Sequence, residues 1–177
     1  MKIFFTVLSL LIFSVCVFSQ PQDTIHWSPC YKLKWEDFQD KPDNNSIYGA
    51  ISRPGIKYSL SINENTFSTK VVCYFLKSKS WSKFKNNDSL LKHEQLHFDI
   101  TELFARKLRK AFTEYKFNLQ TISPDFKKIF AQIKQEKDNM NILYDKETSL
   151  SRNETQQLFW NKKIKSELDK LKEYASH

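Results

Sequence analysis

The feature that most constrains this chain is a His-Glu-x-x-His motif at residues 93–97. Apolar residues recur around it at steps of three and four: Leu90, Ile100, Phe104 and Leu108. This spacing predicts a helix on which both histidines share the apolar stripe. Residues i and i+4 of a helix lie about 5–6 Å apart at Cβ, so His93 and His97 can bind one metal ion. Glu94 is then placed to hold and deprotonate a metal-bound water, so the motif predicts a Zn2+ hydrolase site.

The residues before the motif indicate strands. Runs rich in β-branched and aromatic residues occupy residues 25–27, 48–51, 56–62 and 67–75. Residues 31–35 alternate strictly between apolar and polar side chains, which also predicts a strand. Residues 63–65 are polar and predict a hairpin turn between two of these runs.

The remaining residues indicate three helices. The first begins at Asp88 or Ser89, either of which can cap a helix, and runs to about residue 115. The second begins at residues 123–124, where a proline follows a serine, and ends at residues 139–141. Residues 142–150 then form a connecting segment, and a capping box at residues 151–154 starts the third helix. A sheet followed by helices predicts one α+β domain over residues 20–177, with a small, mainly antiparallel sheet first.

The N-terminus has the pattern of a secretory signal peptide over residues 1–19. Lys2 is followed by an apolar run over residues 3–18, and a small-x-small site ends at Ser19. A membrane anchor is the alternative, but a span needs about 20 apolar residues. Cys16 suggests a lipoprotein, although Val15 before it fits that processing poorly. We therefore expect a secreted or periplasmic protein without an integral membrane span after cleavage.

Composition excludes several other classes. The chain has only two glycines, so glycine-dependent nucleotide loops are excluded. Its net charge of +8 comes from scattered lysines with acidic neighbours, which is typical of a solvated surface. We expect no nucleic-acid partner, because a clustered basic stripe and a binding module are both missing. Two cysteines, Cys30 and Cys73, remain after signal removal, and they either form a disulfide or are buried thiols.

A catalytic zinc needs a third protein ligand, and the motif helix does not offer a histidine for it. Ile100 and Leu103 stand where a metzincin would have glycine and histidine. The remaining mature histidines lie near the two ends of the chain, at residues 26 and 177. The carboxylates near or after the second helix are the other candidates: Glu136, Asp145, Glu147 and Glu154. We take Glu147 as the expected ligand, and Tyr144 as a donor to the developing oxyanion, with aromatic packing as its alternative role.

Several separated segments resemble one protein family. They are residues 33–38, 80–81, 90–100 with Glu102, Ala105, Arg106 and Leu108, and Tyr144-Asp145-x-x-Thr148 with Gln157 and Trp160. Together they resemble the DUF922 family of predicted secreted zinc-dependent proteases. The resemblance implies a zincin-like domain with His93 and His97 as zinc ligands and Glu94 as the catalytic base.

One position departs from that family. Its late segment typically continues to a His-Gly pair, where this chain has Leu150 and Ser151. Leucine cannot coordinate a metal, so either a nearby carboxylate replaces the histidine or metal binding is weakened. The sequence thus predicts a zinc metallopeptidase acting on a peptide or protein substrate. The alternative is a non-catalytic family member that binds a partner or a cell-envelope component.

Overall fold

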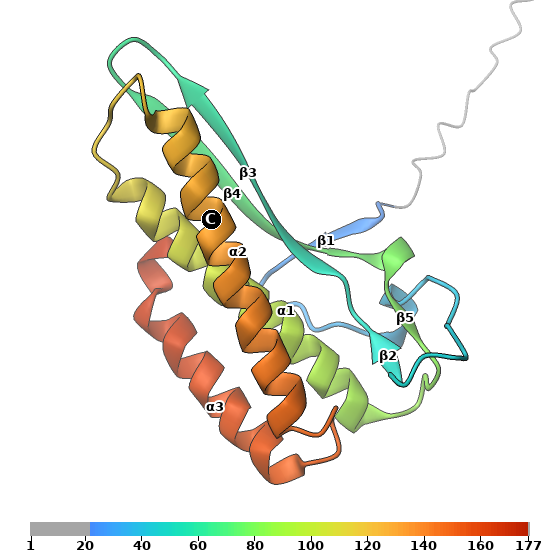
Figure 1. The fold of residues 1–177 in the computed structure, drawn as a ribbon. Helices are drawn as coiled ribbons and strands as arrows, with labels where there is room; N and C mark the ends of the chain where they lie inside the picture. The colour runs from blue at the N-terminus through green and yellow to red at the C-terminus, as the bar shows by residue number, and fades with distance from the viewer. Residues whose placement is uncertain (1–21, 177) are drawn as a thin grey trace, which may run out of the picture.

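The computed structural model describes residues 22–176, and the predicted signal peptide and Cys16 lie outside this range. Strands come first and helices after them, which confirms the α+β prediction (Figure 1). The strands are β1 (Thr24–His26), β2 (Ala50–Ile51), β3 (Pro54–Ile62), β4 (Phe67–Leu76) and β5 (Trp81–Ser82). The helices are α1 (Asp88–Thr113), α2 (Ile122–Glu147) and α3 (Glu154–Lys170), with short 3-10 turns at Trp35–Asp37, Lys77–Lys79 and Lys172–Tyr174.

The main sheet has three antiparallel strands in the order β1-β4-β3. β3 and β4 form the predicted hairpin, whose register runs from Pro54 opposite Phe75 to Ile62 opposite Phe67. A separate two-stranded ladder pairs β2 with β5, with Ala50 opposite Ser82. Only Ser52 and Arg53 separate β2 from β3, and the N–H of Ser52 donates to Oε2 of Glu94 in α1 at 3.0 Å.

α1 is the central element, because it contacts β3, β4 and both other helices (Figure 1). One apolar cluster lies where the sheet, α1 and α2 meet, and it includes Phe75, Phe98 and Phe112. A second cluster joins α1 to α3 and includes Phe104 and Trp160. Burying each such side chain contributes about 1.5–3 kcal/mol, so these clusters fix α1 against all of its neighbours.

The strand predicted over residues 31–35 does not form. Leu33 and Trp35 are buried as the alternation predicts, but the backbone N–H of Leu33 donates to Oε1 of Gln95 at 2.8 Å. A 3-10 turn starts at Trp35, and Asp37 accepts from the backbone N–H of Lys34 at 2.8 Å. Buried and exposed side chains do alternate along this segment. Its backbone N–H groups, however, donate to side-chain oxygens rather than to a neighbouring strand.

The connecting segment predicted over residues 142–150 is mostly helix. α2 continues to Glu147, because Tyr144 is fully buried against α1 and α3 and this packing outweighs the weak helix propensity of residues 139–141. Three residues with positive φ follow the helix: Ser149 (51°), Leu150 (54°) and Ser151 (76°). α3 is capped by Asn153, whose side chain accepts from the N–H of Gln156, rather than by the predicted box at residue 151.

The two cysteines in the described part of the chain are free thiols. Cys30 is exposed in a loop, whereas Cys73 is buried in β4. The disulfide alternative is therefore wrong, and the alternative of buried thiols is correct for Cys73 but not for Cys30. Within residues 22–176, every helix is too short or too polar to cross a membrane.

Candidate metal centre

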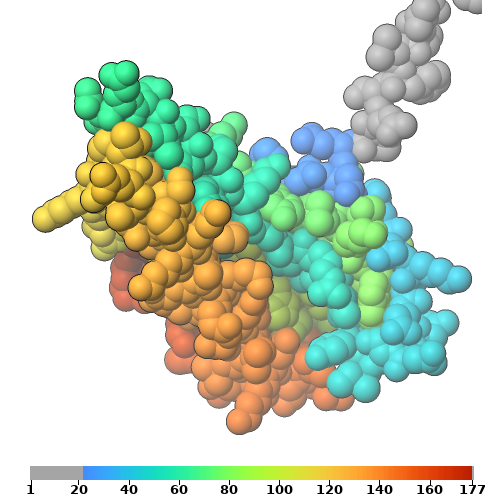
Figure 2. Space-filling view, turned by 45° about the horizontal axis from the view of Figure 1, so that its top comes forward, coloured from blue at the N-terminus to red at the C-terminus, as the bar shows by residue number. Residues whose placement is uncertain are grey.

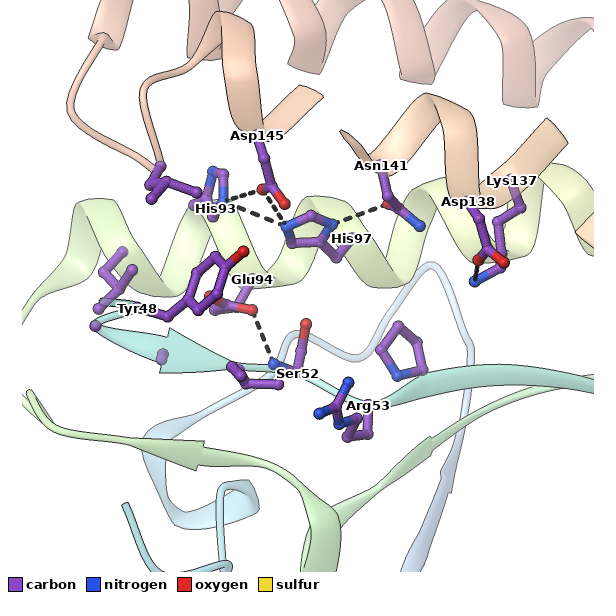
Figure 3. Close-up of a pocket in the computed structure, with 16 residues that line it drawn as sticks. Tyr48, Ser52, Arg53, His93, Glu94, His97, Lys137, Asp138, Asn141 and Asp145 are labelled. Atoms are coloured by element: carbon purple, nitrogen blue, oxygen red, sulfur yellow. Dashed lines mark hydrogen bonds and ion pairs between the residues drawn. The ribbon is translucent and has the colours of Figure 1, made fainter. Parts of the chain in front are cut away.

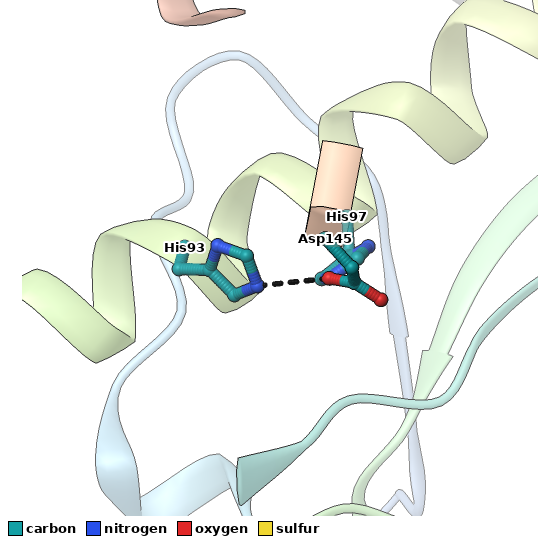
Figure 4. Close-up of side chains that lie close together, drawn as sticks. All are labelled: His93, His97 and Asp145. Carbon is teal, nitrogen blue, oxygen red and sulfur yellow. Dashed lines mark hydrogen bonds and ion pairs between the residues drawn. The ribbon is translucent and has the colours of Figure 1, made fainter. Parts of the chain in front are cut away.

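α1 places His93 and His97 on the face that looks toward the end of α2 (Figure 4). The helix starts after Asn87, whose side chain accepts from the N–H of Leu90, so the motif lies one turn inside a capped helix. His93 is buried, and its Nε2 lies 3.3 Å from Nε2 of His97. The two imidazoles therefore aim the same nitrogen at a common point, as the motif predicts.

Asp145 of α2 supplies a carboxylate to that point. Its Oδ1 lies 3.1 Å from Nε2 of His93 and 3.0 Å from Nε2 of His97. Together these residues are the group in the described chain that could hold a metal ion. Asp145 was one of the carboxylates considered from the sequence, but Glu147 was the ligand expected.

Glu147 lies elsewhere. Its Oε2 accepts from the indole Nε1–H of Trp160 at 2.7 Å, which ties the end of α2 to α3. Residues two apart on a helix differ by about 200° around its axis, so Asp145 and Glu147 cannot face α1 together. The structure thus assigns the carboxylate of this group to Asp145 and gives Glu147 a structural contact.

The other ring nitrogen of each histidine faces an amide oxygen. Nδ1 of His93 lies 3.3 Å from Oε1 of Gln157, and Nδ1 of His97 lies 2.9 Å from Oδ1 of Asn141. An amide oxygen only accepts, so Nδ1 donates its hydrogen there, and an imidazole in its neutral form then presents a free lone pair at Nε2. This is the arrangement by which proteins orient metal-binding histidines.

These residues fit a zinc ion. Two Nε2 lone pairs and a carboxylate oxygen converge within 3.0–3.3 Å, and three acceptors this close repel unless a cation or a proton lies between them. Ligand atoms at about 2.0–2.1 Å from a tetrahedral zinc are about 3.3 Å apart, which agrees with the observed spacing. Three protein ligands also leave a fourth position for water or substrate, as in catalytic rather than structural zinc sites.

The pKa values of the group reflect its crowding. Burial alone would raise the pKa of Asp145, but its contacts with His93 and His97 hold the pKa well below the ordinary value. Burial alone would lower the pKa of His97, but Asp145, Glu94 and Asn141 together raise it. The point between His93, His97 and Asp145 therefore favours a positive charge, and a zinc ion must compete with a proton for it.

The ring of Tyr144 packs against both histidines. Its ring stacks on that of His93 with centroids 4.5 Å apart, and it meets the ring of His97 edge-on at 4.9 Å. The side chain is fully buried, and its hydroxyl donates to Oε1 of Gln157 at 2.7 Å. Burial raises the pKa of this phenol well above its ordinary value. The geometry matches the packing role rather than the expected oxyanion donor.

Glu94 lies beside the histidines and is held by the strand segment. Its Oε2 accepts from the backbone N–H of Ser52 at 3.0 Å, while the other carboxylate oxygen stays available to accept a proton (Figure 3). The side chain is buried but borders a cavity of about 430 Å3. A carboxylate fixed in this way is placed to act on a group bound next to the histidines.

The cavity lies between α1, α2 and the segment of residues 48–54. Figure 2 shows α2 and the chain around β2 facing one another across a hollow in the surface. His93, Glu94, His97 and Asp145 all border the cavity, and so does Leu150. Leu150 thus borders the same cavity as the candidate ligands.

The sequence did not predict that Asn141 and Gln157 contact the two histidines. Asn141 lies four residues before Asp145 on α2, so a search for polar residues at helical spacing would have found it. Gln157 was part of the family resemblance, but its contact with His93 spans 64 residues and depends on how α3 packs.

Comparison with known proteins supports the family resemblance. The family model described as "Bacterial protein of unknown function (DUF922)" matches residues 31–152, which include both histidines, Glu94 and Asp145. No curated protein and no solved structure matches the chain. The match covers more than half of the sequence. The chain therefore belongs to the DUF922 family.

Proposed function

We propose that this protein is an exported zinc-dependent metallopeptidase. The observation that carries the proposal is the convergence of Nε2 of His93, Nε2 of His97 and Oδ1 of Asp145 beside the carboxylate of Glu94. The first three would hold the ion, and the fourth stands outside the ligand set, as a general base must. A bound zinc ion would polarise a substrate carbonyl and lower the pKa of a coordinated water toward neutrality.

Glu94 then has two tasks. It accepts a proton from the attacking water and passes it to the leaving amine of the peptide. The hydrogen bond from Ser52 fixes one carboxylate oxygen, so the other keeps a constant direction toward the cavity. Gln157 and Asn141 keep both imidazoles in the tautomer that presents Nε2. The open cavity leaves room for an extended peptide beside residues 48–54.

Export rests on the sequence pattern of residues 1–19. Expression of the full chain in a bacterial host, followed by mass spectrometry of the exported product, measures where the chain is cleaved. A mature N-terminus near residue 20 is the expected result. Retention of the intact chain in the cytoplasm would contradict export.

Two measurements test the enzyme assignment. Elemental analysis of the purified mature protein should find about one zinc per chain, and the His93→Ala variant should lose it. Hydrolysis of a mixed peptide substrate should be lost in Glu94→Gln, which keeps the acceptor for Ser52 and therefore should retain zinc. Zinc-free wild-type protein would overturn the metal site. Equal turnover by wild type and Glu94→Gln would overturn the role of Glu94 as base.

The alternative is a family member that keeps the fold but does not catalyse a reaction. Leu150 at the edge of the cavity is the observation that favours it, because this side chain offers neither a ligand nor a proton. This alternative predicts no hydrolysis of any peptide, whether or not zinc is bound. The same assays therefore separate the two functions.

A further inference from the structure

The cavity has two chemically different ends. A Cβ atom on Gly49 would lie 3.2 Å from the side chain of Leu90, and Ser52 bonds to Glu94, so residues 48–54 run in the same direction as α1. α2 runs the opposite way, because Asn141 meets His97 and Asp145 meets His93. The candidate zinc ligands therefore lie between the two ends.

One end is largely apolar and the other is charged. The first is bordered by Tyr48, Leu90 and Leu150. The second is bordered by Arg53 from the strand side and by Lys137 and Asp138 from α2 (Figure 3). A ligand that spans the cavity must therefore present different groups to its two ends.

The charged end carries an excess of positive charge. Asp138 is already engaged by Lys137 at 2.8 Å and by Lys134 at 3.2 Å. Arg53 is exposed, and among residues 22–176 its guanidinium has neither a hydrogen-bond partner nor an ion-pair partner. Its backbone is fixed by a hydrogen bond from its N–H to Oγ of Ser80 at 3.0 Å. The guanidinium of Arg53 can therefore bind an anionic group in the cavity, and the backbone of this residue is held in place.

We propose that this end of the cavity binds a carboxylate of the substrate through Arg53. A guanidinium matches a carboxylate with two parallel hydrogen bonds, whereas a neutral amide offers one acceptor oxygen. The carboxylate belongs to an acidic side chain or to the C-terminus of a peptide. The apolar end takes an apolar side chain on the other side of the candidate zinc ligands. The inference deepens the proposed peptidase function by defining its substrate class.

Binding can be measured without turnover. We suggest fluorescence anisotropy with zinc-supplemented Glu94→Gln protein and short labelled peptides that differ only in Glu or Gln at one scanned position. Each peptide is made with a free and with an amidated C-terminus, which distinguishes the two sources of the carboxylate. The carboxylate peptides should bind about tenfold more tightly than their neutral counterparts, since hydrogen bonds to charged groups contribute on this order.

A second substitution assigns the preference to Arg53. Glu94→Gln/Arg53→Gln should lose the preference and keep its affinity for the neutral peptides. The matched control is Glu94→Gln/Lys127→Gln, which removes a positive charge from an exposed position of α2 outside the cavity and should keep the preference. Equal affinity for acidic and neutral peptides, absence of binding, or an unchanged preference without Arg53 would each overturn the proposal.

The result is independent of catalysis. A carboxylate preference in the binding assay together with no hydrolysis by the wild type supports this site and rejects the peptidase. Hydrolysis by the wild type without any carboxylate preference supports the peptidase and rejects this site. In an active wild type, Arg53→Gln should lower kcat/KM about tenfold for acidic peptides only, and zinc content should not change.

Discussion

Replacement of Asp145 by Asn tests the candidate metal centre most directly. Asparagine has nearly the same shape, so the α2 backbone and the packing of its neighbour Tyr144 should persist. The substitution removes the negative charge and the anionic oxygen that lies 3.0–3.1 Å from both Nε2 atoms. Any loss of zinc can then be attributed to the lost ligand rather than to a cavity in the core.

The size of the effect can be derived from typical zinc sites. Sites with four protein ligands bind zinc with apparent free energies of roughly 10–16 kcal/mol, so one ligand contributes about 3 kcal/mol. This corresponds to about a hundredfold increase in Kd. With zinc in excess, a hundredfold weaker site loses about 2.7 kcal/mol of ligand-induced stabilisation. For a chain of this size, the zinc-induced rise in Tm should shrink by about 5–11 °C.

Calorimetric titration of the metal-free protein measures Kd, and thermal unfolding with and without zinc measures the shift in Tm. Glu147→Gln is the matched control, because it removes a carboxylate two residues away and keeps an acceptor for Trp160. It should leave both quantities unchanged. A large loss of zinc affinity in Glu147→Gln with none in Asp145→Asn would refute the reasoning and restore the expectation from the sequence.

Three further predictions concern residues around the site and in the core. Gln157→Met removes the acceptor of His93 Nδ1, so zinc affinity measured by calorimetry should fall about 10–100-fold; an unchanged Kd would contradict an orienting role. Glu102→Ala leaves two arginines of α1 unpaired around a fully buried site, so chemical denaturation should show a loss of about 3–5 kcal/mol. Burial and the hydrogen bond to Asp37 raise the pKa of Tyr31 to about 12, so this contact stabilises the fold below pH ~10 and is lost as the pH rises toward 12. Ultraviolet titration of Tyr31→Phe should lose one late tyrosinate step relative to the wild type, and the loss of a step near pH 10 instead would reject the shift.

Local sequence patterns were sufficient for the elements that carry the site. The three-and-four spacing around residues 93–97 predicted α1 and the shared face of its histidines, and the hairpin of β3 and β4 followed from alternating runs around a polar turn. Such patterns are reliable because each depends on a period set by backbone geometry within one element. They failed at residues 31–35, where the backbone is satisfied by side chains, and at residues 142–147, where packing of Tyr144 extends α2.

The sequence by itself determined the first two candidate zinc ligands, the candidate base and the order of sheet and helices. The tertiary structure decided which carboxylate is the third candidate ligand, because Asp145 and Glu147 are equally plausible along the chain and only the rotation of α2 against α1 separates them. It also decided that Gln157 and Asn141 orient the histidines and that Arg53 opens onto the same cavity. These relations connect residues more than 40 positions apart, so they depend on how the helices pack rather than on any local pattern.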